Sequence, residues 1–295
     1  MASYSIKELE NLSGIKAHTI RIWEKRYGII NPARTDTNIR YYSDNNLKRL
    51  LNIAILNRYG MRISSISKLS EIELTEKVIN VSSDTSNAES NVENLIVAMV
   101  EMDESKIDRI FSRYIMHEGF EKSVTKIIFP FFEKIGLLWQ TGSINPAHEH
   151  FVSNIFRQKL MVAIDNVVIP ENKNVDKFIL FLPEGELHEL ALLYYNYLIK
   201  KSGKRVYYLG SSVPYKDLEE TNKRVNPDFL FTSLTSSLNK TDVKQYLKKL
   251  SKTFSSLKIF VTGLQIKDSS IEVPSNVIKV ASSNDFIDLI KNLKK

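Results

Sequence analysis

The sequence predicts a multidomain fold: a winged helix-turn-helix head, a four-helix bundle and a five-stranded α/β domain. Three observations along its 295 residues support this expectation. Turn-forming residues separate short helical segments in the first quarter, apolar residues recur at helical spacing in the middle, and short apolar runs alternate with helical stretches in the last part. We expect the head to cover residues 1–75, a linker 76–91, the bundle 92–172 and the α/β domain 173–295.

The composition is that of an ordinary globular protein, with 43% hydrophobic and 25% charged residues. No apolar run approaches the length of a membrane span, and residues 1–14 have no basic patch followed by an apolar core. We therefore expect a cytoplasmic protein without a membrane partner. The chain has no cysteine, which excludes disulfides, thiol catalysis and cysteine-ligated metal.

Charge is unevenly distributed along the chain. Residues 1–70 hold twelve Lys and Arg against five Asp and Glu, whereas the remainder holds 29 of each kind. The whole net charge of +7 therefore lies in the first quarter. A basic segment joined to a neutral remainder is typical of a nucleic-acid-binding head on a body with another task, although a solvated basic surface gives the same pattern.

The head is expected to begin with two helices joined by a glycine turn. Ser5 starts a short helix, Gly14 makes the turn, and a second helix covers residues 16–27. The turn-rich stretch 31–43 then predicts a wing, and apolar periodicity predicts a further helix over residues 44–59.

The middle of the chain is expected to hold four helices after a linker. Residues 82–91, SSDTSNAESN, are small and polar without apolar periodicity, so they predict a flexible linker. From Val92 to about Ile169 the apolar spacing is helical, and this length accommodates four helices, which predicts a small bundle.

Five short apolar runs follow: KFILFL, RVYYLG, DFLFTS, KIFVTG and NVIKVA, with helical stretches such as residues 187–202 and 240–253 between them. Strands joined by crossover helices indicate a doubly wound parallel sheet of the flavodoxin-like, Rossmann type. Ligands of such sheets bind outside the carboxyl ends of the strands, where the strand order reverses. The loop after the first strand, PEGELHEL, is therefore the leading candidate for a ligand site.

Several residues of the head suit DNA contacts. The N-terminal half of the second helix carries side chains that reach base edges when such a helix lies in the major groove. Arginines of the wing would hold phosphates, and one of its two tyrosines would add a hydroxyl contact. Trp23 and Tyr27, at helical spacing, are expected to pack instead. The DNA-contacting candidates are Lys16, His18, Thr19, Arg21, Arg34, Arg40, Tyr41 and Tyr42.

Two motifs in the head carry a family resemblance. R-I-W-E-K-R-Y-G, followed by N-P-A-R-T-x-T-N-x-R-Y-Y, resembles the MerR winged-helix DNA-binding domain, in the branch with Trp-Glu-x-Arg-Tyr-Gly, over about residues 3–70. Many MerR-type metal and oxidant sensors use cysteines, which this chain lacks, and they dimerise through a long helix directly after the head. Here the polar linker comes first, so the resemblance implies that assembly depends on the body of the chain.

The body carries two groups of residues that suit ligand binding. Trp139 is followed, after nine residues, by Glu149 and His150, and the three residues fall where one expected helix ends and the next begins. Glu186 and His188 lie in the loop after the first strand. Histidine binds transition metals well, and a nearby carboxylate commonly orients its second ring nitrogen. A lone histidine is more often a satisfied polar residue and a tryptophan more often packs, so spacing alone leaves both interpretations open.

A four-helix cap followed by a flavodoxin-like domain with His188 in its first loop is similar to the cobalamin-binding module of corrinoid methyltransferases. Joined to a MerR-type head, it resembles the CarH and LitR family of adenosylcobalamin-dependent photoreceptor repressors. The resemblance implies that His188 binds cobalt in place of the cofactor's dimethylbenzimidazole, while Trp139, Glu149 and His150 face the adenosyl group. The implied cofactor-binding residues are Trp139, Glu149, His150, Glu186, His188, Ser233, Thr235 and Gly263.

The resemblance also implies a mechanism. Adenosylcobalamin would order the chain into a tetramer on double-stranded operator DNA in the dark, and light would break the cobalt–carbon bond and release monomers or dimers. Linking several weak heads raises avidity, which explains why dissociation would release DNA. A corrinoid enzyme would use the same module, but the chain has no catalytic domain and carries a DNA-binding head, so we expect a regulator and not an enzyme.

The chain departs from the family pattern where the displaced nucleotide tail of the cofactor would lie. Ala191 replaces the Gly of Glu-x-His-x-x-Gly, Thr235 the Leu of Ser-x-Leu, and Thr262 the first Gly of a Gly-Gly pair. Gln140 follows Trp139 where one branch has a second cobalt-binding His, which excludes a bis-His photoproduct through that position. We expect a cobalamin regulator with altered affinity or light response. The alternative is a regulator whose module has lost cobalamin and senses another tetrapyrrole or a protein partner.

Overall fold

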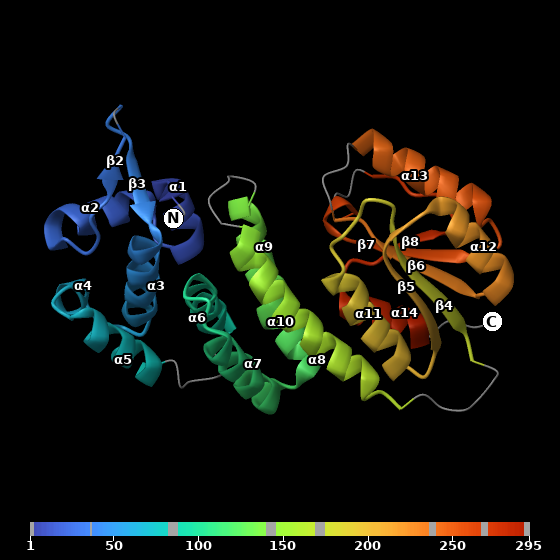
Figure 1. Cartoon of the computed structure of the whole chain (residues 1–295), viewed down its shortest axis with the longest axis horizontal. Helices are drawn as coiled ribbons and strands as arrows, with labels where there is room; N and C mark the ends of the chain where they lie inside the picture. Colours follow the sequence, from blue (N-terminus) through green and yellow to red (C-terminus); the bar gives the residue numbers. More distant parts are fainter. Residues whose placement is uncertain are drawn as a thin grey trace. The chain divides into compact units, whose positions relative to one another are not determined.

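The computed structural model describes residues 3–35, 37–81, 88–139, 146–168, 175–235, 240–266 and 271–291 (Figure 1). The chain divides into two compact units, Met1–Ile155 and Phe156–Lys295, and each is described by itself. Within the described parts, no helix is both long enough and apolar enough to cross a membrane.

The first unit begins with the predicted winged helix-turn-helix head. Ser5 caps the first helix in a reciprocal capping box with Glu8, and Gly14 ends it with a φ of 71°, a left-handed conformation that glycine adopts without strain. The wing is an antiparallel sheet of order β1-β3-β2, whose first strand was not expected from the sequence. The elements are β1 (Ser3–Tyr4), α1 (Ile6–Ser13), α2 (Ala17–Tyr27), β2 (Ala33–Arg34), β3 (Arg40–Ser43), α3 (Asp44–Arg58), α4 (Ile63–Ile66) and α5 (Glu71–Val81).

Four helical segments follow the head, as predicted. They are α6 (Ala88–Val100), α7 (Glu104–Glu118), a continuous helix made of α8 (Phe120–Ser123), the π-turn η1 (Val124–Ile128) and α9 (Phe129–Trp139), and α10 (Pro146–Asp165). The apolar faces supply buried side chains such as Leu95, Phe111 and Phe131. Helix α10 continues across the boundary between the two units.

The expected linker differs from the structure at both ends. Helix α5 runs to Val81 and α6 already begins at Ala88, so helices occupy much of the stretch 76–91. Ser90 and Asn91 are buried despite their polar side chains. Packing within the first unit thus overrides the weak local helix propensity on which the expectation of a flexible segment depended. Residues 82–87 lie outside the described parts of the chain.

The second unit contains the predicted doubly wound α/β domain. Its five strands are parallel and lie in the order β5-β4-β6-β7-β8, so the order reverses at β4 and β6. The strands are β4 (Lys177–Pro183), β5 (Arg205–Val213), β6 (Phe229–Ser233), β7 (Lys258–Thr262) and β8 (Val277–Lys279). The helices are α11 (Leu190–Lys201), α12 (Tyr215–Val225), α13 (Lys240–Thr253) and α14 (Ser283–Lys291), with a short 3-10 turn, η2 (Leu264–Ile266).

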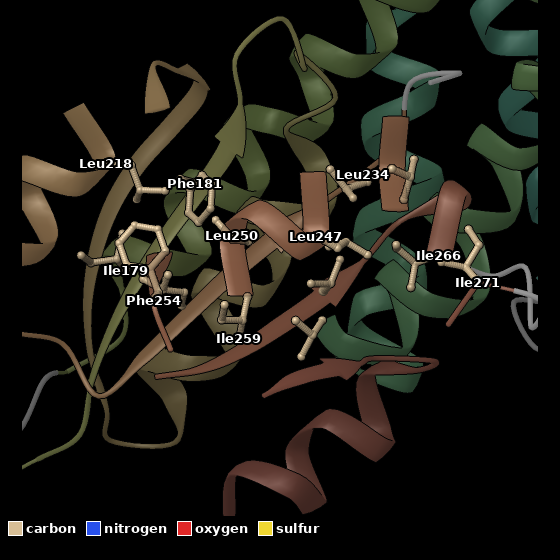
Figure 2. Close-up of a cluster of buried hydrophobic side chains, with 14 residues drawn as sticks. Ile179, Phe181, Leu218, Leu234, Leu247, Leu250, Phe254, Ile259, Ile266 and Ile271 are labelled. Carbon is tan, nitrogen blue, oxygen red and sulfur yellow. The ribbon is translucent and has the colours of Figure 1, made fainter. Parts of the chain in front are cut away.

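Helices cover both faces of this sheet, α11 and α14 on one side and α12 and α13 on the other (Figure 1). Side chains of each strand alternate between the two layers, as a pleated strand requires. Leu230 and Leu234 belong to the buried cluster beneath α12 and α13, which Figure 2 shows. Phe231 points the other way and contacts Tyr195 of α11 and Phe286 of α14. The strand ends and the loops that follow them remain as the place for a ligand site.

Candidate functional site

The loop after β4 is held in one conformation by backbone hydrogen bonds. The Glu186 N–H donates to the Pro183 carbonyl oxygen at 2.9 Å and closes a turn, while the Ser212 N–H donates to the Glu186 carbonyl oxygen at 3.1 Å. The Gly185 N–H donates to the Ser212 hydroxyl at 3.1 Å. These bonds attach the loop to the end of β5, so the side chains that it presents are fixed relative to the sheet.

Glu186 and His188 form a carboxylate–imidazole pair in this loop. One carboxylate oxygen, Oε1, lies 2.6 Å from the His188 Nδ1 and also accepts the His188 N–H at 3.0 Å. The other, Oε2, accepts the Thr235 N–H at 2.9 Å. Glu186 is only 5% exposed and therefore joins the loops after β4 and β6, at the point where the strand order reverses.

This geometry suits a single metal–histidine bond. Because Nδ1 faces the carboxylate, a metal–histidine bond would use the opposite ring nitrogen, Nε2, and a carboxylate on Nδ1 fixes the tautomer that such a bond requires. The His188 side chain is 53% exposed. Among the described residues, no group of three His, Asp or Glu gathers to hold a bare metal ion. One axial histidine suffices when a macrocycle supplies the other ligands, as in haem proteins.

The other expected cofactor residues of this unit lie at the same edge of the sheet. Ser233 ends β6 and is buried, with its hydroxyl 3.4 Å from that of Thr235. Gly263 follows β7 with a φ of +108°, and a Cβ there would lie 2.3 Å from the Leu234 carbonyl oxygen. The tight approach of two backbones therefore requires this glycine. Thr262 donates its hydroxyl to the Val280 carbonyl oxygen at 3.2 Å.

Sequence reasoning missed an ionic cluster directly after His188. Glu189, at the start of α11, accepts the Tyr208 hydroxyl at 2.9 Å, and its Oε2 lies 3.7 Å from Arg157 Nη2 on α10. Burial and the neighbouring carboxylate raise the pKa of Tyr208, so this hydroxyl stays a donor. The three residues are far apart in the sequence and form no motif, so no local signal predicts them.

The second expected group, in the first unit, is described in part. Trp139 is the last residue of α9, and its side chain and Gln140 lie outside the described parts of the chain. Glu149 and His150 lie in the first turn of α10, where Glu149 Oε2 is 3.1 Å from His150 Nδ1 and the imidazole side chain is 70% exposed. Next to them, His148 has a buried Nδ1 without a hydrogen-bond partner, which the sequence reasoning overlooked.

The head presents a basic groove of about 610 Å³ between α2 and the wing. The groove brings together three of the predicted DNA-contacting arginines, Arg21, Arg34 and Arg40. Arg40 Nε lies 3.0 Å from Glu24 Oε1, and Arg34 Nη1 donates to Asn38 Oδ1 at 2.6 Å. The remaining residues that line the groove are Glu24, Lys25, Asn31 and Pro32.

The other predicted contacts of the head separate into exposed and buried residues. Lys16 and His18 are exposed, and Thr19 is partly exposed with its hydroxyl 3.3 Å from the His18 ring. Tyr41 is 38% exposed. Tyr42 is fully buried and donates its hydroxyl to Glu24 Oε2 at 3.1 Å, so of the two tyrosines expected to offer a phosphate contact only Tyr41 is exposed. A strand of alternating faces turns one of two adjacent tyrosines inward.

Two family models match this chain. Residues 4–71 match the MerR HTH family regulatory protein model, and residues 92–163 match the B12 binding domain model. The first match covers the head and the second covers the segment from α6 to α10. The head is therefore similar to the DNA-binding domain of MerR-type regulators, and the helical segment that follows it is similar to B12-binding domains.

The relatives of the chain make the comparison more particular. The chain is 27% identical to the HTH-type transcriptional repressor CarH of Myxococcus xanthus over 254 residues, which are 84% of each protein. It is 23% identical to the repressor CarA of the same organism, over 97% of this chain and 96% of CarA. The monomethylamine corrinoid protein of Methanosarcina barkeri shares the fold, with a TM-score of 0.51 and 14% identity over 65% of this chain and 93% of that one.

Proposed function

We propose that this chain is a regulator that represses transcription from operator DNA and that a cobalamin bound through His188 controls it. The observation that carries the proposal is the Glu186–His188 pair, which presents an oriented imidazole at the reversal point of the sheet. The B12 binding domain match and the similarity to two proteins named as repressors support it. The cofactor form that we propose is adenosylcobalamin, whose cobalt–carbon bond supplies a reaction that light can trigger.

In this proposal the chain supplies position and contacts. His188 would bind the cobalt through Nε2, and Glu186 would hold its tautomer. Leu187, which is 65% exposed between them, would offer an apolar surface to the ring. Trp139, Glu149 and His150 would contact the adenosyl side, and Ser233, Thr235 and Gly263 would line the sheet edge. Ligand-dependent assembly into a tetramer would then bring several heads to one operator.

The cofactor part of the proposal is tested by an absorbance titration of the purified chain with adenosylcobalamin in the dark. We expect wild type to bind and His188→Ala to lose most of its affinity, since the cobalt–histidine bond is removed. His117→Ala, an exposed histidine on α7, is the matched control and should bind like wild type. Equal affinity of His188→Ala and wild type would reject His188 as the ligand.

A second candidate follows from the same residue. An axial histidine also holds haem, and Thr262 and Ala191 depart from the cobalamin pattern, so a regulator that senses another tetrapyrrole is the alternative. Titration of the chain with hemin separates the two functions. A haem spectrum that depends on His188, together with indifference to adenosylcobalamin, would favour the alternative.

The DNA part rests on the groove of the head. Arginine and lysine contacts to phosphates release counterions, so binding of a random-sequence duplex should weaken steeply with salt. We expect Arg34→Ala to reduce the slope of log K against log salt by about one, whereas Arg109→Ala, an exposed arginine on α7, should leave it unchanged. Binding of wild type that does not respond to salt would contradict the proposed surface.

A further inference from the structure

The layer between the sheet and helices α11 and α14 is filled by aromatic rings. Tyr195 of α11 lies 4.6 Å from Phe231 of β6 and 5.1 Å from Phe286 of α14, measured between ring centroids, and Phe231 lies 5.1 Å from Phe286. None of the three is more than 5% exposed. Rings in mutual contact at these distances occupy the space that they enclose.

Tyr195 also comes close to the ligand edge of the same layer. Its hydroxyl lies near the side chain of Thr262, the last residue of β7, and the Thr262 hydroxyl donates to the Val280 carbonyl oxygen at 3.2 Å. Burial raises the pKa of Tyr195 to about 12, so the phenol stays neutral. Tyr195 therefore extends from α11 toward the carboxyl end of the sheet.

The opposite layer is filled as well. Phe181 of β4 and Leu234 after β6 are buried with residues of α12 and α13 in one apolar cluster (Figure 2). The Leu234 N–H donates to the Thr262 carbonyl oxygen at 2.8 Å, and the Gln265 N–H donates to the Leu234 carbonyl oxygen at 3.0 Å. These bonds join the loops after β6 and β7, and Thr235 in the first of these loops donates its N–H to Glu186. Side chains thus fill the layers on both faces of the sheet.

The two filled layers limit which part of a cobalamin the chain can hold. In a cobalamin the nucleotide tail is attached to the ring face that carries the lower axial ligand. When a protein histidine takes that position, the tail must leave the cobalt and extend toward the protein. Given the proposed function, on which this step rests, we infer that the chain binds the corrin ring through His188 without taking up the nucleotide tail. The ligands that it accepts are then corrinoids in general, whether or not they carry the nucleotide tail.

The chain should therefore prefer adenosylcobinamide to adenosylcobalamin. Adenosylcobalamin must give up its own base to bind His188, and no buried contact of the tail offsets that cost. Adenosylcobinamide, which lacks the nucleotide, carries no such cost. We expect it to bind roughly tenfold more tightly or better, because each 1.4 kcal/mol of uncompensated cost corresponds to a factor of ten.

The experiment is a pair of absorbance titrations of the full chain in the dark, with adenosylcobinamide and with adenosylcobalamin. Tighter binding of the cobinamide supports the inference. Equal or tighter binding of the cobalamin overturns it and leaves the proposed function intact. Binding of neither compound overturns the proposed function itself, and the inference with it.

Variants test whether Tyr195 causes the exclusion. Tyr195→Ala opens the layer beneath Thr262, so it should strengthen binding of the cobalamin and leave the cobinamide unchanged, lowering the ratio of their affinities. Phe254→Ala removes a ring of similar burial from the opposite layer, directly after the C-terminal end of α13 and away from the ligand edge, and should keep the wild-type ratio. Should Tyr195→Ala fail to fold, Thr262→Gly removes the neighbouring side chain at the edge. A wild-type ratio in every folded variant of this edge overturns the assignment.

Discussion

Glu186 uses one carboxylate for two tasks, since it orients the His188 imidazole and accepts the Thr235 N–H from the neighbouring strand end. Glu186→Ala should therefore lower affinity for adenosylcobalamin by about 10–100-fold, the usual effect of losing a group that orients a metal ligand. Glu184→Ala is the matched control, because that carboxylate is exposed in the same loop. Absorbance titration measures both. Equal losses in the two variants would show that loop charge matters and orientation does not.

Packing requires Gly263 whether or not a ligand contacts it. Gly263→Ala places a Cβ 2.3 Å from a backbone oxygen at a φ of +108°, and neither atom can move without breaking the bonds between the loops after β6 and β7. We expect a loss of about 3 kcal/mol in the free energy of unfolding of the second unit. Gly136→Ala, in the open on α9, should change stability by less than about 1 kcal/mol. Hydrogen exchange in β6 and β7 measures the loss, and wild-type protection in Gly263→Ala would contradict it.

A histidine and a carboxylate in the first loop of a doubly wound sheet are a local signal, so the sequence marked His188 as a candidate, and the family resemblance supplied its expected role as a cobalt ligand. The same reasoning could not find Tyr195 or Glu189. The roles of both residues depend on what α11 packs against. The helical spacing of a tyrosine does not show which residues of other elements its ring contacts. The burial of Tyr42 was missed for the same reason.

An ion pair joins the head to the helices that follow it. Arg58 at the end of α3 bonds the Glu93 carboxylate of α6 through both terminal nitrogens, at 2.7 and 3.1 Å, and Glu93 is fully buried. Removal of one partner from a buried pair leaves an uncompensated charge. We expect Arg58→Ala to lower the free energy of opening of α3 and α6 by about 3–5 kcal/mol at neutral pH, measured by hydrogen exchange.

The pKa of Glu93 determines the direction in which this stability changes with pH. Burial raises the pKa of Glu93 despite its arginine partner, so the folded state binds this proton more tightly than the unfolded state does. The contribution of Glu93 to stability is thus complete below its unfolded pKa and is lost as the pH rises through its folded pKa. Without Arg58, the stability that is lost as the pH rises should be larger. Arg58→Ala should therefore regain part of its stability in acid. Arg62→Ala, an exposed neighbour, should show neither effect.

Helices and strands with strong periodicity were predicted within a few residues, including all five strands of the sheet. The segment around Ala88 was not, because SSDTSNAESN has no apolar stripe. Tertiary packing stabilises α6 as a helix from that point, because Glu93 and its neighbours are buried in the first unit. The polar sequence of this segment gives no sign of that burial. The π-turn at Val124–Ile128 likewise has no signature in the composition of its residues.

The proposed switch of the complete chain is a change in the number of DNA-binding heads that are linked in one assembly. A single basic groove makes few phosphate contacts, so a lone chain should hold DNA weakly, and linked heads bind as a unit. Size-exclusion chromatography of the chain with adenosylcobalamin should then give a larger species in the dark that carries corrinoid absorbance. Illumination should shrink it, because loss of the adenosyl group removes what Trp139, Glu149 and His150 are proposed to contact.

His188→Ala tests whether the larger species depends on the bound cofactor. This variant should elute at the size of the cofactor-free chain both in the dark and after illumination. Arg34→Ala should assemble like wild type, because its effect is confined to the DNA groove. A corrinoid-carrying species whose size does not respond to light would contradict the photoreceptor form of the proposal. The same result would place control of the heads in cobalamin binding itself, because the bond proposed between His188 and the cobalt does not depend on the adenosyl group.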